Sequence, residues 1–141
     1  MEEASRYSAG GDPGLRAAVE RLYADLGRDD AEWAPDTVAE DTASLVIGSD
    51  PDEWWQGHAA ICAAWAKAKA EHGGTALSPE RLAISRHGDV AWVTDEPSYA
   101  VEGGRSQGSL RLTMVFVREP ERWRLAHLHA SVAVPNSALL D

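Results

Sequence analysis

Asp95 and Tyr99 are the pair of residues in this sequence best suited to proton-transfer chemistry. Both residues are separated from Ala91 and Val93 by even numbers of positions, so an extended strand places all four side chains on one side. An aspartate in apolar surroundings has a raised pKa and can act as a general base or acid, with the tyrosine as a hydrogen-bond donor. The two side chains converge only if the strand bends at Pro97. The alternative is that this segment is a strand-end turn in water.

Two histidines, His127 and His129, fall on one side of a second predicted strand, about 7 Å apart along it. Such a pair binds zinc or iron when a third ligand is present. The sequence has no HExxH motif, no cysteine cluster and no nearby carboxylate on that side, so we expect no metal and no cofactor. Hydrogen bonds to Ser131, to Thr113 or across an interface are the expected role of these histidines.

Six tryptophans are the other notable residues of this small chain. Aromatic residues usually fill a core, but a subset can line a pocket for a flat apolar ligand. His58 follows Gly57 at a predicted helix N-terminus, where the helix dipole disfavours a protonated imidazole. It is either a neutral group at the pocket mouth or a capping or surface residue. The residues we expect to line the pocket are Trp33, Trp55, His58, Ile61, Trp65, Val93, Leu112, Met114, Phe116 and Leu128.

Length and charge set limits on partners and location. The chain has 141 residues and a formal net charge of −10. Such a chain repels phosphate backbones and anionic lipids, so we expect neither nucleic acid nor a membrane as partner. The sequence has no long apolar stretch, no secretory signal pattern and a single cysteine, Cys62, which makes a cytoplasmic protein our expectation.

The elements that must position these residues follow from the hydrophobic periodicity. A flexible tail over 1–12, one domain over 13–135 and a short tail over 136–141 are expected. Asp12-Pro13 is a helix start signal. The expected elements are helices over 13–26 and 58–72, helical turns within 30–40, a strand over 42–48, and a four-strand antiparallel meander over 81–87, 90–102, 105–118 and 123–135. This order predicts an α+β fold in which a long curved sheet wraps around the helices as a cone.

The last two strands each have one uniformly apolar face. Alternation places Leu110, Leu112, Met114 and Phe116 of one strand, and Ala126, Leu128, Ala130 and Val132 of the other, inside the cone. The opposite face mixes apolar and polar residues, as protein–protein interfaces do. We therefore predict a homodimer interface formed by Arg111, Thr113, Val115, Trp123, Leu125, His127, His129 and Ser131, the alternative being a solvated face.

Three segments resemble a known family. The strand pattern Trp-x-Leu-x-His-x-His-x-Ser at 123–131 resembles the last strand of SnoaL-like domains in the NTF2-like superfamily, and also the association domain of calcium/calmodulin-dependent protein kinase. The segments DPDEWWQGHAAI and GDVAWVTDE are similar to their counterparts in SnoaL-like proteins of unknown function. The resemblance covers roughly residues 13–135.

This resemblance implies a cone with an interior pocket and a dimer made through the outer sheet face. It also implies that the side carrying Asp95 points inward, as the base of a ketosteroid isomerase-like site with Tyr99 as donor, although the full donor pair of those isomerases has no match here. The pocket arginines of the kinase domain align with Pro97, Met114 and Ala130, so its anion binding is not implied. The expected function is binding of a small hydrophobic molecule, with isomerase- or cyclase-type proton transfer; the alternative is a non-catalytic association module.

Overall fold

The structure of the protein is a computed structural model that describes residues 12–101 and 104–140. The predicted tail over 1–11, the strand end at Glu102 and the first turn glycine, Gly103, lie outside the described residues. Helix α2 (Pro13–Leu26) begins at Asp12, whose side chain accepts a hydrogen bond from the Leu15 amide at 2.9 Å. The predicted N-cap is therefore confirmed, and Asp12, the last residue of the predicted tail, is part of the helix start.

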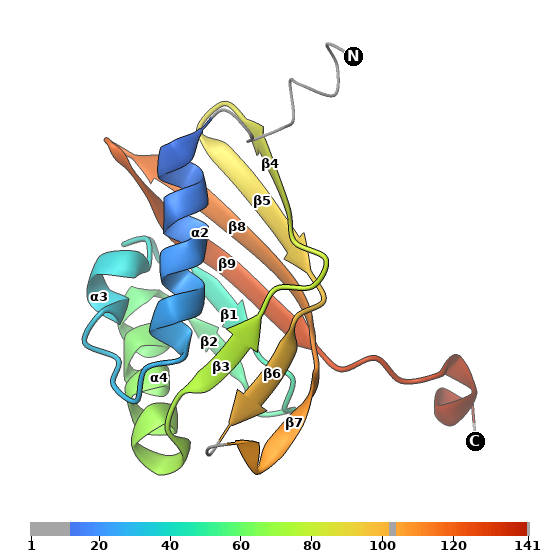
Figure 1. Cartoon of the computed structure of the whole chain (residues 1–141). Helices are drawn as coiled ribbons and strands as arrows, with labels where there is room; N and C mark the ends of the chain where they lie inside the picture. The colour runs from blue at the N-terminus through green and yellow to red at the C-terminus, as the bar shows by residue number, and fades with distance from the viewer. Residues whose placement is uncertain (1–11, 102–103, 141) are drawn as a thin grey trace, which may run out of the picture.

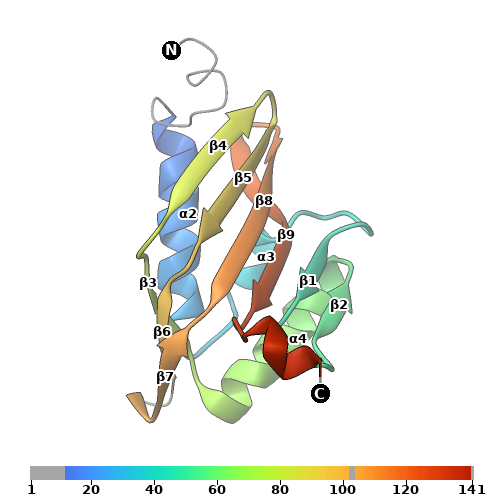
Figure 2. The same cartoon turned by 90° about the vertical axis from the view of Figure 1, so that its right-hand side faces the viewer.

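The other helices lie on the same side of the sheet as α2 (Figure 1). The short α3 (Ala34–Thr37) and the longer α4 (His58–His72) match the predicted helical turns and helix. Gly57 and Gly73 bracket α4 with φ angles of 93° and 75°, a backbone region that favours glycine. The 3-10 turn η2 (Asn136–Leu139) follows the last strand; it stands away from the body in Figure 1 and lies in front of the sheet in Figure 2.

A six-stranded sheet forms the wall of the molecule, in the order β2-β1-β9-β8-β5-β4. Its strands are β1 (Leu45–Ile47), β2 (Trp54–Gln56), β4 (Ala83–His87), β5 (Val90–Asp95), β8 (Arg111–Glu119) and β9 (Arg122–Ser131). The pair β1–β9 is parallel and the other pairs are antiparallel. The predicted α+β class is confirmed, whereas the pattern of the sequence did not predict the parallel pair.

A second, three-stranded sheet replaces part of the predicted meander. It consists of β3 (Thr75–Ser78), β6 (Ser98–Val101) and β7 (Ser106–Ser109), in the order β3-β6-β7. The expected long strands over 90–102 and 105–118 are each interrupted, at Pro97 and at Leu110, where the Leu110 amide donates to the Pro97 carbonyl at 3.0 Å. Because proline has no amide to donate, the chain leaves the first sheet there. The bend predicted at Pro97 is confirmed, and β3 was not predicted.

A β-bulge on β9 changes which side chains face inward. Val115 pairs with His127, but the next residue, Phe116, pairs with Leu125, so Ala126 is an extra residue on β9. A bulge of this kind shifts the alternation of the strand by one position. Side chains before Ala126 therefore lie on the face opposite to the one that uninterrupted alternation assigns.

Trp123 and Leu125 are the two predicted interface residues that lie before the bulge on β9. Both are buried, with 8% and 1% of their surfaces exposed, so their predicted place on the outer face is wrong. Beyond the bulge and within β9 the predicted faces are correct: Leu128 and Ala130 are buried, while His129 is exposed. Val132, predicted to lie inside the cone, follows the end of β9 and is 54% exposed, so that prediction is wrong. The inward residues of β8, Leu112, Met114 and Phe116, are also buried as predicted.

The core lies between the helices and the inner face of the six-stranded sheet. Leu15, Val19 and Leu22 of α2 are at most 1% exposed and belong to one apolar cluster with Met114 and Phe116 of β8. Within the described residues, no helix is both long enough and apolar enough to cross a lipid bilayer.

Candidate functional site

An apolar pocket of about 160 Å³ lies where the end of α2 meets α4 and the inner face of the sheet. Its volume is close to that of an apolar cavity known to bind benzene, roughly 150 Å³. Its apolar lining consists of Leu26, Val46, Trp55, Trp65, Leu77, Leu110, Leu112, Leu128 and Ala130, and the remaining lining residues are Gly48, Ser49, Glu53 and Thr75.

Four of the predicted pocket residues line this space: Trp55, Trp65, Leu112 and Leu128. The other apolar residues predicted there do not, because they are buried in the core: Trp33, Ile61, Val93, Met114 and Phe116. The pocket is therefore smaller than predicted. Side chains fill most of the cone, and the space that remains is at one end of it.

Trp65 forms one wall of the pocket and is supported from behind by Trp33. The two rings have centroids 5.1 Å apart and are tilted by 47°. The Trp33 indole donates to the carbonyl of Asp30 at 2.8 Å, which fixes its orientation. Tilted aromatic pairs at this distance are favourable beyond the area they bury. Trp33 therefore positions the pocket wall without lining it.

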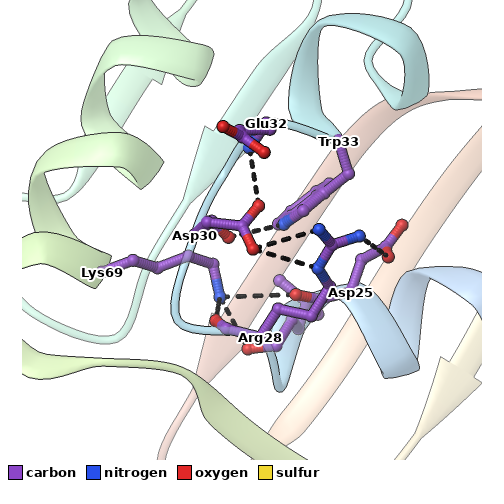
Figure 3. Close-up of polar contacts among 7 residues, drawn as sticks. Asp25, Arg28, Asp30, Glu32, Trp33 and Lys69 are labelled. Atoms are coloured by element: carbon purple, nitrogen blue, oxygen red, sulfur yellow. Dashed lines mark hydrogen bonds and ion pairs between the residues drawn. The ribbon is translucent and has the colours of Figure 1, made fainter.

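A buried lysine joins the two helices that carry the pocket walls. Figure 3 shows Lys69 reaching from α4 to the end of α2, where its ammonium donates to the carbonyls of Leu26 at 2.7 Å and Arg28 at 2.8 Å. These carbonyls lie at and just beyond the C-terminus of α2, where backbone acceptors lack helical partners and a cation is favoured. Burial lowers the pKa of Lys69, while the charges of Asp29 and Asp30 oppose that shift.

This lysine was not singled out from the sequence, although it follows Trp65 by one helical turn. Its ammonium also lies 5.5 Å from the centroid of the Trp33 ring. One side chain therefore contacts the end of α2, which bears Leu26, and the ring that supports Trp65. Lys69 is a positioning residue for the pocket.

Glu53 is the one ionisable side chain among the described residues that line the pocket. It follows the turn at 50–52, where its amide donates to the Asp50 carbonyl at 3.0 Å and its Oε1 accepts from the Asp50 amide at 2.9 Å. Its Oε2 accepts no hydrogen bond from a described residue. A half-buried carboxylate with one uncommitted oxygen beside an apolar space has the chemistry of a general acid or base.

The position of this carboxylate depends on Gly48. A Cβ at Gly48 would come within 2.2 Å of Glu53 Oε1 and 2.7 Å of Glu53 Cβ. The Gly48 amide also donates to the Glu53 carbonyl at 2.8 Å, which joins the two residues across the turn. Glu53 was not among the predicted site residues, because it directly follows residues of turn-forming types at 49–52. The signal that was available is a glutamate placed directly before a strand with two tryptophans.

Asp95 is buried, as the resemblance to SnoaL-like domains implied for its side of the strand, but it does not line the apolar pocket. Only 6% of its surface is exposed. Its Oδ2 accepts from the Tyr23 hydroxyl at 2.7 Å, and its Oδ1 accepts from the amides of Arg81 at 2.7 Å, Glu96 at 2.8 Å and Glu80 at 3.3 Å. Both oxygens are occupied, so the prediction of a free base at Asp95 facing the pocket is wrong.

The tyrosine that contacts Asp95 is Tyr23, not Tyr99. Tyr99 lies beyond the Pro97 bend on β6, in the three-stranded sheet, where its ring covers Gly108. Burial, and then the hydrogen bond and charge of Asp95, raise the pKa of Tyr23. The predicted pairing of Tyr99 with Asp95 failed because the bend carries β6 into another sheet.

His58 lies outside the apolar pocket, beside a shallow depression at the start of α4. Its Nε2 donates to the Pro35 carbonyl at 2.8 Å, which connects α4 to α3. The thiol of Cys62, whose pKa is raised by burial, lies 4.0 Å from the same nitrogen. The prediction that His58 lines the pocket is wrong.

The two strand histidines share the outer sheet face with Thr113 and Val115. His127 Nδ1 donates to the carbonyl of Leu45 at 2.9 Å, and the rings of His127 and His129 make an edge contact with centroids 6.3 Å apart. Among residues 12–101 and 104–140, no three histidine, cysteine, aspartate or glutamate residues lie close enough to hold a metal ion.

Comparisons with known proteins agree with this architecture. The SnoaL-like domain family matches residues 15–135. An NTF2-like protein of unknown function from Pseudomonas putida KT2440 superposes with a TM-score of 0.79 at 17% identity, over 94% of this chain and 93% of that one. A candidate dehydratase of the NTF2-like family from Streptomyces avermitilis gives a TM-score of 0.71 at 22% identity, over 86% and 95%.

A protein from Thiobacillus denitrificans named for the association domain of calcium/calmodulin-dependent protein kinase type II gives a TM-score of 0.73 at 22% identity, over 86% of this chain and 97% of that one. No curated protein matches the sequence. At these identities the solved structures establish the NTF2-like fold, and an activity cannot be transferred from them.

Proposed function

This chain belongs to the SnoaL-like domain family, and from that premise we propose that it binds a small apolar molecule in the pocket described above and moves a proton on it with Glu53. The observation that carries the proposal is the single carboxylate, half-buried and with one oxygen uncommitted, in a lining otherwise made of apolar and uncharged side chains. The candidate dehydratase among the structural neighbours is consistent with such chemistry.

The size of the pocket limits the ligand. A volume of about 160 Å³ lies below the usual range for drug-sized ligands, roughly 300–1,000 Å³. It accommodates one six-membered ring, and Trp55 and Trp65 offer such a ring flat apolar surfaces. The hydroxyls of Ser49 and Thr75 are the uncharged polar groups that could orient a carbonyl oxygen. A monocyclic ketone is therefore a suitable probe.

Isomerisation of cyclohex-3-enone tests the proposal directly. The base removes a proton from C2, the double bond shifts, and the same proton is returned at C4 to give cyclohex-2-enone, so nothing is consumed. We expect the protein to accelerate this reaction, measured by the absorbance of the conjugated enone. Glu53→Gln should lower the rate by about 10²–10⁴-fold, the usual contribution of a positioned acid or base.

Two further variants make the result specific. Gly48→Ala should also lower the rate, because its methyl group displaces the Glu53 carboxylate, while Glu71→Gln on the exposed side of α4 should leave it unchanged. Binding is followed separately through the indole resonances of Trp55 and Trp65. Ketone binding with no isomerisation, or isomerisation unaffected by Glu53→Gln, would reject the catalytic role. Absence of shifts at both indoles would reject the binding site.

We also propose that two copies pair through the outer sheet face. Residues adjacent across the strands give this face a continuous row of Trp92, Val115 and His127, with Thr113 and His129 in the next row. Trp92 is 36% exposed and lies beside the half-buried Val115 and His127, so the row has a contiguous exposed apolar part, a feature that marks interaction surfaces. An interface made of such residues matches the usual mixture of aromatic, aliphatic and polar groups.

Sedimentation at micromolar concentration tests this assembly. We expect twice the chain mass of 15.2 kDa. Val115→Asp should give a monomer, because it places a charge at the centre of the face, whereas Ala70→Asp on the exposed side of α4 should not. A monomeric wild-type protein would leave the pocket proposal standing and remove the dimer.

A further inference from the structure

A second hollow lies at the opposite end of α2 and is lined by the first turns of this helix and by the β8–β9 hairpin. Figure 1 shows the end of this hairpin near the start of α2. It has a volume of about 270 Å³ and shares no lining residue with the apolar pocket. Three arginines from three different elements line it: Arg21 of α2, Arg118 of β8 and Arg122 of β9. We refer to it as the arginine cleft. Such convergence is unexpected in a chain with a net charge of −10.

Two of these arginines have no ion-pair partner among the described residues. Arg122 is committed, because its guanidinium lies 2.7 Å from the carboxylate of Asp36, whose pKa it lowers. The charge of Arg21 also lowers the pKa of Asp36, but it contributes less than Arg122 does. Neither Arg21 nor Arg118 forms an ion pair with a described residue. Two guanidinium groups are therefore available to a ligand at the rim of the cleft.

The acids of the cleft leave one positive charge uncompensated. Asp12 is held by the Leu15 amide and by the guanidinium of Arg86, which itself lies 5.1 Å from the ring of Trp123. Glu121 is the remaining acid of the lining and forms no ion pair with a described residue. With Asp12 and Arg122 committed elsewhere, Arg21 and Arg118 exceed Glu121 by one charge. This balance suits a monoanion, not a polyphosphate.

The floor of the cleft is apolar. Its lining includes Leu22, Phe116 and Trp123. Each of them is at most 8% exposed, so these side chains belong to the packed core and are held in place. Gly14, Ala17 and Ala18 form the α2 side of the cleft, and these small residues leave it open. A ligand that fits this combination has an apolar part on the floor and a single anionic group at the rim.

We propose that the arginine cleft is a second binding site, which takes an amphipathic carboxylate. The carboxylate accepts hydrogen bonds from Arg21 and Arg118, and a short alkyl chain or single ring lies on Leu22, Phe116 and Trp123. Guanidinium groups suit this role because their planar donors match the geometry of a carboxylate. The site is independent of the proton-transfer pocket, so either one can exist without the other.

Titration of the 15N-labelled protein with sodium octanoate tests the proposal, with 1-octanol as the neutral probe of the same chain length. The six tryptophan indole resonances report on both hollows at once, because Trp123 lies in the arginine cleft while Trp55 and Trp65 lie in the apolar pocket. We expect octanoate to shift the Trp123 resonance saturably. Octanol should bind there at least about threefold more weakly, since one charged hydrogen bond is worth roughly that or more.

Variants at the rim distinguish a built site from simple partitioning onto apolar surface. Arg21→Gln and Arg118→Gln should each weaken octanoate binding by about three- to tenfold and leave octanol binding unchanged. Arg16→Gln, on an exposed position of the same helix outside the cleft, is the matched control and should change neither. Octanoate affinity that is equal in all three variants and the wild type would overturn the proposal. Shifts confined to Trp55 and Trp65 would also overturn it, because they would place the probe in the other pocket.

Discussion

Glu53 and Asp95 are two carboxylates in the same half of the molecule, and they differ in how fully their oxygens are satisfied. Asp95 accepts hydrogen bonds from a tyrosine and three backbone amides, and it is 6% exposed. Glu53 is half-buried and accepts one hydrogen bond from a described residue, the Asp50 amide. A saturated carboxylate holds elements together, whereas a carboxylate with a free oxygen beside a pocket remains available for a ligand. Burial alone does not identify a catalytic acid.

Removing the Asp95 carboxylate should have the largest effect on stability. Asp95→Ala leaves the Tyr23 hydroxyl and the amides of Arg81 and Glu96 without their acceptor. A buried polar group left unsatisfied costs about 1–3 kcal/mol. The Tyr23 hydroxyl is buried, whereas the hydrogen bonds of the two amides are only part-buried, so the loss in the free energy of unfolding should be roughly 2–5 kcal/mol. Urea denaturation measures it. A loss below about 1 kcal/mol would mean that Asp95 does not hold α2 to the end of β5.

Lys69→Met should have the next largest effect, because it keeps the length of the side chain and removes its donors. The carbonyls of Leu26 and Arg28 lose their partner, at a cost of roughly 1–3 kcal/mol. Because Lys69 positions the walls that carry Leu26 and Trp65, cyclohex-3-enone should also bind more weakly. Lys67→Met is the control, because Lys67 lies on the exposed side of the same helix. Lost stability with unchanged ketone affinity would limit Lys69 to a capping role.

The two carboxylates also show how far the sequence could predict the site. Alternation grouped Asp95 with Ala91 and Val93, and the resemblance to SnoaL-like domains implied that this side points inward, as the burial of Asp95 confirms. It could not show that Tyr23, 72 residues away in sequence, would reach the carboxylate. After Pro97 the chain enters the other sheet and carries Tyr99 away from Asp95, and only the tertiary structure reveals that path. Glu53 was missed for the related reason that it follows turn-forming residues, and only the folded chain places it in the lining of the pocket.

The same limit applies to the fold. Periodicity predicted the extents of α2 and α4 closely, because an amphipathic stripe bounded by Asp12-Pro13 or by glycines is a local signal. It failed at Ala126, where a bulge breaks the alternation and turns Trp123 and Leu125 inward. A bulge depends on the partner strand and has no strong mark in sequence. The parallel pairing of β1 with β9 and the strand β3 also depend on distant partners.

Tyr23→Phe should have a smaller effect on stability, about 1 kcal/mol at neutral pH, because it removes one hydrogen bond and keeps the ring. Its effect should depend on pH. The folded protein raises the pKa of Tyr23 above its ordinary value of 10.0, so above pH 10 the unfolded chain loses this proton while the folded chain keeps it. The wild type should therefore lose stability as the pH rises above about 10, and Tyr23→Phe should lose less. Parallel curves for the two proteins would contradict this assignment.

Glu53→Gln should have the smallest effect on stability, and that makes it the sharpest test of the comparison. Glutamine keeps an oxygen at Oε1 to accept from the Asp50 amide, and its amide group replaces the uncommitted Oε2. The free energy of unfolding should change by less than about 0.5 kcal/mol, as for most substitutions away from a buried network. The isosteric change at the other carboxylate, Asp95→Asn, should cost about 1–3 kcal/mol, because an amide group would face the Tyr23 hydroxyl or the backbone donors. Urea denaturation of both variants beside the wild type gives the two values under identical conditions. If Glu53→Gln destabilises the protein as much as Asp95→Asn, Glu53 is a structural residue of the turn, and its free oxygen has no part in proton transfer.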